Sequence, residues 1–166
     1  MRLGPGEFFF EDIGVGDDFA TSAVTVTDAH IVAFAGLAGD LFDVHMDETF
    51  AREKGFEGRI AHGLLILSLV DGLKTRCTTR LMSIAALGWN WSFRTPVYPG
   101  DRIRTRFELR AKRLTRSGDR GILTLGVVVT NQSDIVVQEG EHLLMVGCRE
   151  VPDGTSNSQK QDTGRN

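Results

Sequence analysis

A carboxylate and an imidazole stand five residues apart in the segment FAGLAGDLFDVH, residues 34–45. Asp40 closes a run of small residues that favours a helix, and His45 follows a stretch that fits neither a helix nor a tight turn. Residues five apart on a regular helix point in different directions, but a loop between two short helices can direct both side chains to one point. The pair could then move protons on and off a single water molecule, because burial can tune both groups toward neutral pH. The spacing alone favours a simpler interpretation, in which Asp40 caps a helix end and His45 packs beneath it.

The tetrapeptide IAHG, residues 60–63, opens the most apolar segment of the chain. The first N–H groups of a helix have no partner inside the helix and carry the positive end of its dipole, so they suit a developing oxyanion. Gly63 would let a ligand approach closely, because it has no side chain. A glycine needed for tight packing at a helix start explains the same residue equally well. We expect the neighbouring His62 to support or pack beside this donor rather than act as an acid or base.

Three helices are predicted to position these groups. The first covers residues 29–38, with a cap at Thr27 and a stop at Gly39. A short second helix covers residues 47–55. The third, residues 62–76, has apolar side chains nearly all round, so we expect it to be buried on most sides.

The remaining elements are predicted strands. Residues 18–27 are rich in Val and Thr and form the first. From residue 83 onward the apolar period changes to two, which predicts an antiparallel meander of four long strands. Trp89, Trp91 and Phe93 give one strand an aromatic face that we expect to pack on the buried helix. The simplest way to bury that helix is an α+β fold of the hotdog type, with the sheet curled around it; a sandwich with helices flat on one face is the alternative.

Length and composition are those of one globular domain, with 166 residues, 41% of them hydrophobic and 25% charged. We assign the domain to residues 1–150 and expect residues 151–166 to be a disordered tail, because their polar composition cannot offset the entropy of ordering. The net charge of −3 argues against nucleic acid or an anionic membrane as a partner. No apolar run approaches the roughly 20 residues of a membrane span and no secretory leader is recognisable, so we expect a cytoplasmic protein.

The two cysteines, Cys77 and Cys148, are far apart and lack a C-x-x-C motif or a neighbouring histidine. They therefore indicate neither a zinc site nor a redox motif, and we expect reduced, buried thiols.

Three alternating arginines, Arg102, Arg104 and Arg106, share one face of a predicted strand. A solvated strand face is the simpler interpretation. The other is a patch that holds the phosphates of coenzyme A.

Larger motifs now support a resemblance. FAGLAGDLFDVHMDETFA followed by RIAHGLL resembles the hydratase motif of the MaoC-like, (R)-specific enoyl-CoA hydratase/dehydratase family, whose pattern is Gly-Asp-x-Asn-Pro-aliphatic-His. Gly39, Asp40, Val44 and His45 match it. FEDIGVGDDF near the N-terminus and FRTPVYPGD at 93–101 also look like segments of that family, so the similarity covers roughly residues 8–150.

The chain departs from that pattern at Phe42 and Asp43, which replace Asn-Pro. The resulting form, Gly-Asp-x-Phe-x-x-His-Met-Asp, resembles a subgroup that includes the hydratase domain of the bifunctional phenylacetate-degradation protein. The catalytic Asp and His survive in that subgroup, which supports the enzyme interpretation.

The resemblance implies reversible syn addition of water to a trans-2-enoyl thioester of coenzyme A, giving a 3R-hydroxyacyl product. It implies that Asp40 and His45 are catalytic and that Gly63 donates to the oxyanion, with His62 and Phe42 grouped among the substrate-binding residues. No metal and no cofactor is expected, because coenzyme A is part of the substrate. The resemblance also implies a homodimer or a larger even assembly. Two alternatives stay open: a hotdog acyl-CoA thioesterase, and a non-catalytic acyl-CoA-binding subunit of a hydratase complex.

Overall fold

The computed structural model describes residues 1–149, so the tail predicted at 151–166 lies outside the described residues. The helices are α1 (Asp28–Ala38), α2 (Asp43–Met46), α3 (Glu48–Glu53) and α4 (Gly63–Thr75). The strands are β1 (Gly6–Phe8), β2 (Asp18–Ala20), β3 (Val24–Thr25), β4 (Thr79–Leu81), β5 (Ser83–Phe93), β6 (Arg102–Leu114), β7 (Arg120–Thr130) and β8 (Val136–Gly147). None of the helices in this part of the chain is long and apolar enough to cross a membrane.

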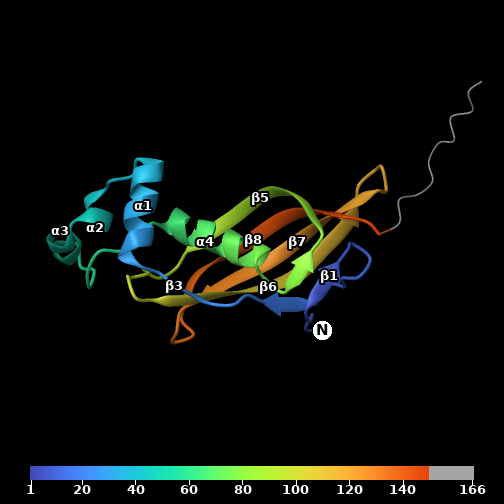
Figure 1. The fold of residues 1–166 in the computed structure, drawn as a ribbon, viewed down its shortest axis with the longest axis horizontal. Coiled ribbons are helices and arrows are strands. Elements are labelled where there is room, and N and C mark those ends of the chain that lie inside the picture. Colours follow the sequence, from blue (N-terminus) through green and yellow to red (C-terminus); the bar gives the residue numbers. More distant parts are fainter. Residues whose placement is uncertain (150–166) are drawn as a thin grey trace, which may run out of the picture.

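One antiparallel sheet carries the fold, with strand order β2-β6-β7-β8-β5 and β3 paired to the start of β6. Figure 1 shows α4 lying across this sheet, while α1, α2 and α3 gather at one end of the molecule. The α4 residues Leu65, Ile66 and Val70 join the inward residues of β6, β7 and β8 in a single core. This arrangement confirms the predicted α+β hotdog fold.

The predicted meander of four consecutive strands is wrong at one point. β6, β7 and β8 follow one another as hairpins, but β5 pairs with β8 at the far edge of the sheet. The segment between β5 and β6 must therefore cross from the β5 edge past β8 and β7 to β6. Its residue Val97 is buried, and the Val97 carbonyl accepts a hydrogen bond from the Ala61 N–H just before α4. Alternation along a strand fixes its faces but not its neighbours, which explains the error.

The predicted strand at 18–27 is broken into β2 and β3. Between them the Thr21 hydroxyl accepts a hydrogen bond from the Thr105 N–H, so a side chain replaces the main chain in the ladder. The prediction that α4 is buried on most sides holds except along one strip of the helix. Leu64 is 59% exposed and Ser68 is exposed, whereas Leu65, Ile66, Val70 and Leu73 are buried.

Both cysteines are buried and free, as the sequence predicts. A further buried polar cluster joins α4 to the sheet. His142 is fully buried and stacks on Trp89 with ring centroids 3.7 Å apart, while the Lys74 ammonium lies 3.0 Å from its Nε2 atom and 2.6 Å from an Asp71 oxygen. Burial, with the neighbouring Lys74 charge, lowers the pKa of His142 to about 4.

Candidate active site

The loop that carries Asp40 and His45 begins where α1 ends. The Thr27 side chain caps α1 as predicted, and Gly39 closes it in the left-handed conformation, with φ of 72°. The chain then turns through Asp40 into α2, a four-residue helix that was not predicted and that carries His45. Asp47 follows, and its side chain accepts hydrogen bonds from the first N–H groups of α3. The end of α1 and the start of α3 thus fix the two ends of the segment that carries Asp40 and His45.

His45 has a defined tautomer, because its Nδ1 atom lies 2.8 Å from the Ile60 carbonyl oxygen. A carbonyl can only accept, so Nδ1 carries the hydrogen and Nε2 holds the free lone pair. Burial lowers the pKa of His45, and nearby His62 adds to this effect; the Ile60 hydrogen bond and the Asp40 carboxylate oppose it. The imidazole is therefore held as a neutral base with one nitrogen available.

Asp40 lies near a ring nitrogen of His45. Its side chain is exposed, and one carboxylate oxygen accepts a hydrogen bond of 3.3 Å from the Phe42 N–H. One side-chain atom from each of Asp40, His45 and His62 lies within 4.8 Å of the other two. A water molecule bridging two such groups needs a separation below about 5.6 Å, twice a hydrogen bond of about 2.8 Å. The spacing suits one bridging water.

His62 lies behind this pair, with only 2% of its surface exposed. Its ring stacks on that of His45, with centroids 3.8 Å apart and planes 27° from parallel. Its Nε2 atom lies 3.0 Å from the main-chain carbonyl oxygen of Asp40. The sequence grouped His62 with the substrate-binding residues, whereas this burial puts it beneath the dyad.

The same three residues form a candidate metal-binding group by distance. A metal ion lies in the plane of each imidazole that binds it, at about 2.0–2.1 Å from the nitrogen. Two nearly parallel rings stacked face to face direct their lone pairs along separate planes, so His45 and His62 as oriented do not converge on one ion. The arrangement favours proton transfer over metal binding.

Gly63 is the first residue of α4, directly after His62. Its carbonyl accepts a hydrogen bond of 3.0 Å from the buried Gln138 side chain, which in turn accepts one of 2.8 Å from the Trp91 indole. A Cβ atom at Gly63 would lie 2.6 Å from the Phe93 ring. The packing role considered for this glycine therefore has a structural basis, and its role in the close approach of a ligand stays a prediction.

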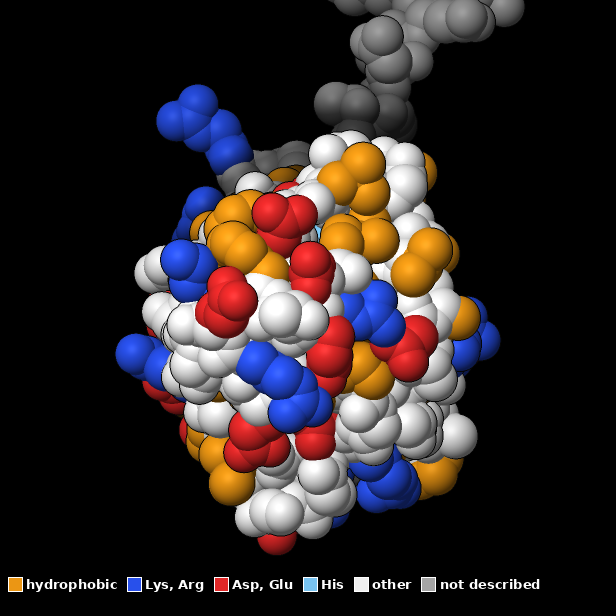
Figure 2. All heavy atoms as spheres, turned by 90° about the vertical axis from the view of Figure 1, so that its left-hand side faces the viewer, with side chains coloured by type: hydrophobic (Ala, Val, Ile, Leu, Met, Phe, Trp, Pro, Cys, Tyr) orange, Lys and Arg blue, Asp and Glu red, His pale blue; other side chains and the backbone are white. Residues whose placement is uncertain are grey.

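Exposed apolar side chains lie next to the dyad in the sequence. Phe42 is 58% exposed, and its ring stands edge-on to His45 with centroids 6.4 Å apart. Leu41 and Leu64 are also exposed. Figure 2, which faces the end with α1 to α3, shows hydrophobic and acidic side chains side by side there and only a small area of histidine between them. A dyad of this kind could receive a ligand with an apolar portion.

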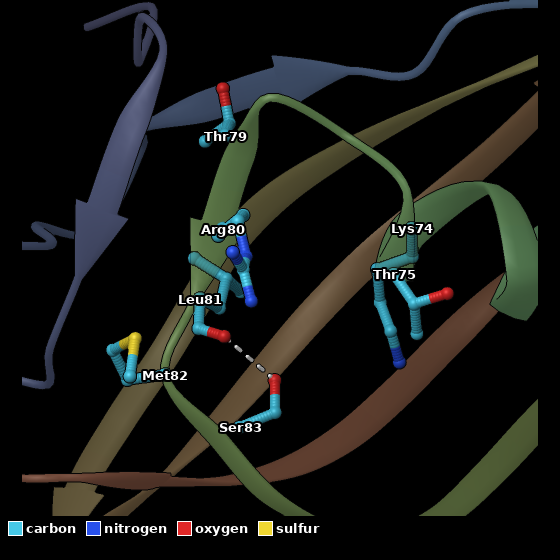
Figure 3. Close-up of a pocket in the computed structure, with 7 residues that line it drawn as sticks. All are labelled: Lys74, Thr75, Thr79, Arg80, Leu81, Met82 and Ser83. Carbon is cyan, nitrogen blue, oxygen red and sulfur yellow. Dashed lines mark hydrogen bonds between the residues drawn. The ribbon is translucent and has the colours of Figure 1, made fainter.

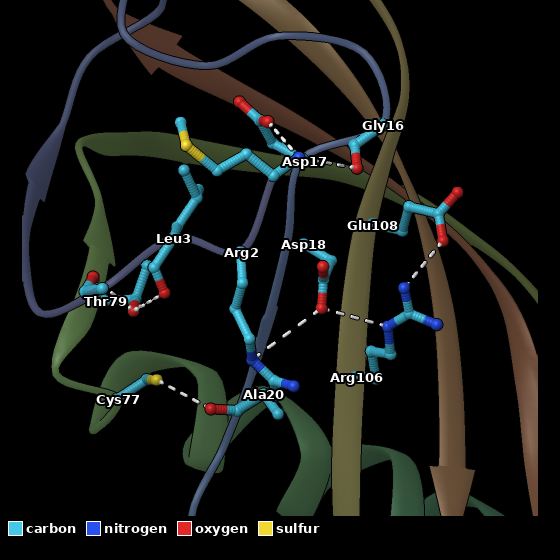
Figure 4. Close-up of polar contacts among 12 residues, drawn as sticks. Arg2, Leu3, Gly16, Asp17, Asp18, Ala20, Cys77, Thr79, Arg106 and Glu108 are labelled. Carbon is cyan, nitrogen blue, oxygen red and sulfur yellow. Dashed lines mark hydrogen bonds and ion pairs between the residues drawn. The ribbon is translucent and has the colours of Figure 1, made fainter.

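The predicted arginine face is present and solvated. Arg102, Arg104 and Arg106 are all exposed on one side of β6. Arg104 pairs with Asp134 at 2.6 Å, and Arg106 pairs with Asp18 at 3.1 Å and with Glu108 (Figure 4). A cavity of about 600 Å³ adjoins them, but carboxylates already balance these two guanidinium groups. The simpler interpretation of the stripe fits these contacts better than a phosphate site.

A smaller cavity of about 230 Å³ lies between the end of α4 and β4 (Figure 3). Its hydroxyl groups are engaged by the main chain: Thr79 donates to the Gly4 carbonyl and Ser83 to the Leu81 carbonyl. This cavity offers no unpaired hydroxyl hydrogen to a ligand.

The family model for the MaoC-like domain matches residues 12–132 of the chain. The chain belongs to the MaoC-like family. It is 35% identical over 113 residues to an (R)-specific enoyl-CoA hydratase from Aeromonas caviae, covering 68% of this chain and 81% of that protein. It is 40% identical over 112 residues to Protein MaoC from Klebsiella aerogenes, covering 67% of this chain but only 33% of that longer protein.

A crystal structure of a MaoC-like dehydratase from Rhodospirillum rubrum is similar to this MaoC-like chain, with a TM-score of 0.78 and 31% identity. The match covers 86% of this chain and 99% of that one. The family expected from the motifs in residues 34–65 therefore agrees with the observed hotdog fold.

Two supporting residues of this MaoC-like site escaped the sequence analysis. The Ile60 carbonyl sets the His45 tautomer, and a main-chain group leaves no signal in residue type. Gln138 holds the start of α4, and here a signal existed, because a polar residue in phase with the buried positions of a strand must find a partner.

Proposed function

We propose that this chain is an (R)-specific enoyl-CoA hydratase, which adds water reversibly to a trans-2-enoyl thioester of coenzyme A. The single observation that carries the proposal is the approach of Asp40 to His45, whose free Nε2 belongs to a neutral, half-buried imidazole. The names of the relatives from Aeromonas caviae and Rhodospirillum rubrum support the substrate class. We further propose that the protein is cytoplasmic.

In the proposed reaction, Asp40 and His45 hold one water molecule by hydrogen bonds. As the water oxygen bonds to the β-carbon, His45 Nε2 accepts a proton from it, and the carbon–carbon double bond shifts its electrons toward the thioester carbonyl. The imidazolium then returns that proton to the α-carbon on the same face, which gives syn addition. Every atom of the water is retained in the product.

Negative charge develops on the thioester oxygen during this step. We propose that the Gly63 N–H stabilises it, because the first N–H groups of α4 lack helical partners. Donors of this kind contribute about 3 kcal/mol to transition-state stabilisation. The step uses no metal and no cofactor.

The MaoC-like chain is expected to work as a homodimer or a larger even assembly. β5 ends the sheet, and its residues Ile84 and Leu87 are 53% and 44% exposed. An unpaired edge with exposed apolar side chains is a surface that a second chain can extend.

The test is a panel of short, branched and aromatic trans-2-enoyl-CoA thioesters, followed by loss of the conjugated thioester absorbance. We expect wild type to hydrate at least one of them, and Asp40→Asn or His45→Gln to lose about 100-fold or more in kcat. Asp43→Asn is the matched control, because that exposed carboxylate lies on the same segment and outside the cluster. It should keep wild-type activity within a few-fold.

Three results would contradict the proposal. Equal activity of Asp40→Asn and wild type would show that Asp40 is not a catalytic residue. Release of free thiol without hydration would identify a thioesterase instead. Binding of acyl-CoA without turnover across the whole panel would indicate a non-catalytic subunit.

A further inference from the structure

The burial of the polar His62 side chain is not explained by packing alone. It is 2% exposed, lies between the rings of His45 and Phe34, and comes just before the first residue of α4. An apolar ring of the same size would fill this space without a polar group to satisfy. Its two nitrogens therefore call for separate explanations.

The Nε2 nitrogen has a partner, the main-chain carbonyl of Asp40, at 3.0 Å. Because that carbonyl can only accept, Nε2 must carry the hydrogen. The bond crosses from the start of α4 to the loop between α1 and α2. It holds the main chain of Asp40 from below, whereas the Asp40 carboxylate on the other side is exposed.

The Nδ1 nitrogen has no hydrogen-bond partner among the described residues and is shielded from solvent. A hydrogen on Nδ1 would be a buried donor without an acceptor, which is unfavourable. The contacts thus satisfy one form of the ring, the neutral tautomer with hydrogen on Nε2. His45 has the opposite tautomer, with hydrogen on Nδ1.

We propose that His62 is a positioning residue of the hydratase site, whose neutral Nε2–H group anchors the Asp40 main chain directly beneath the His45 ring. The inference rests on the proposed function, in which Asp40 and His45 hold the reacting water. It assigns His62 no contact with the substrate. Loss of the anchor should displace the carboxylate and slow the chemical step while leaving binding unchanged.

Two variants separate the donor from the ring. His62→Gln keeps an N–H donor at a similar reach but removes the ring, and His62→Phe keeps the ring but removes the donor. We expect His62→Phe to lower kcat about 10- to 100-fold with KM within about twofold, because a misplacement of roughly 1 Å can cost about 100-fold. His62→Gln should recover at least tenfold of that loss.

Activity of His62→Phe equal to wild type would overturn the proposal. So would a His62→Gln protein that folds, by circular dichroism and thermal unfolding, yet is no more active than His62→Phe. A rise in KM alone would also overturn it, since it would mean that His62 touches the substrate.

A second measurement needs neither a variant nor turnover. Long-range ¹H–¹⁵N correlation spectra of wild type labelled at histidine report which ring nitrogen carries the hydrogen. We expect Nε2–H for His62 and Nδ1–H for His45, and an Nδ1–H form of His62 would overturn the anchor. If wild type hydrated no enoyl thioester, the proposed function would fail and the positioning role with it, while these spectra would still decide whether the contact exists.

Discussion

His45 gains its proposed role from the atoms around it, since the isolated imidazole would be half protonated near pH 6.5. The Ile60 carbonyl occupies one ring nitrogen and burial disfavours the charged form of the ring. Both effects leave a neutral base with one ring nitrogen free and the Asp40 carboxylate nearby. The direction of the pKa shift therefore leads to a test at the scale of a single residue.

On the acid side, the profile of kcat/KM against pH should have its midpoint below pH 6.5. The lowered pKa of His45 means that the neutral base persists as the pH drops past its ordinary value, and that kcat/KM declines only when the imidazole protonates. The measurement is kcat/KM against pH with a pantetheine thioester, because the phosphates of coenzyme A themselves titrate near pH 6. A midpoint at or above 6.5 would contradict a buried His45 base, and the acid-side decline should vanish from the residual activity of His45→Gln.

The sequence predicted part of this site and missed the rest for physical reasons. The irregular segment between two helices correctly indicated that Asp40 and His45 could approach each other. The stacking of His62 under His45 depends on where α4 begins relative to that segment, which is a tertiary contact between residues seventeen positions apart in number. No local pattern encodes such a distance.

At the scale of elements, the start of α4 is held from two sides. His62 joins it to the loop after α1, and the chain from Trp91 through Gln138 to the Gly63 carbonyl joins it to β5 and β8. The helix tip is thus fixed relative to the dyad by hydrogen bonds that involve the loop after α1, β5 and β8, and not by helix propensity. Gly63 is the residue at which this fixation can be tested.

Gly63→Ala should lower kcat, because the added methyl group meets the Phe93 ring at 2.6 Å and also blocks approach to the N–H. The double variant Gly63→Ala with Phe93→Ala separates the two causes. If the N–H receives the oxyanion, the loss of about 10-fold or more should persist after the clash is relieved. Full recovery in the double variant would mean that Gly63 serves packing alone.

Gly36→Ala in α1 is the matched control for that substitution. A Cβ at Gly36 meets nothing within 4 Å. Its activity should be unchanged, and unfolding should cost up to about 1 kcal/mol more, because Ala is the better helix former. Thermal unfolding of the three variants checks this comparison.

The elements themselves were largely predictable, since caps and periodicity are local. Thr27, Gly39 and Asp47 marked helix ends correctly, and the two-residue period identified the long strands. The strand order was not predictable from the sequence. The segment after β5 crosses the sheet, and its path depends on the curvature of the whole sheet, so β5 lies beside β8. The break after β2 depends on one side chain, Thr21, that bonds in place of the main chain.

For the whole molecule, the position of β5 at the sheet edge connects assembly with the site. β5 runs to Phe93, whose ring lies against the Gly63 position at the helix tip. A second chain paired along this edge would cover Ile84 and Leu87 and would extend toward Phe93 at the start of α4. The exposed side of α4, including Leu64, could be covered by the same contact.

Leu87→Lys should therefore yield a smaller species with reduced activity. In a two-fold interface each substitution occurs twice. Two new positive charges would therefore be placed in the apolar contact. Sedimentation equilibrium should give wild type at least twice the chain mass of 18.3 kDa and shift Leu87→Lys toward a single chain. Val15→Lys places the same charge at an exposed apolar residue outside β5 and should change neither mass nor rate. A wild-type mass of one chain at micromolar concentration would exclude the edge contact, and an active monomer would show that the dyad, the helix tip and the acyl site are complete within one chain.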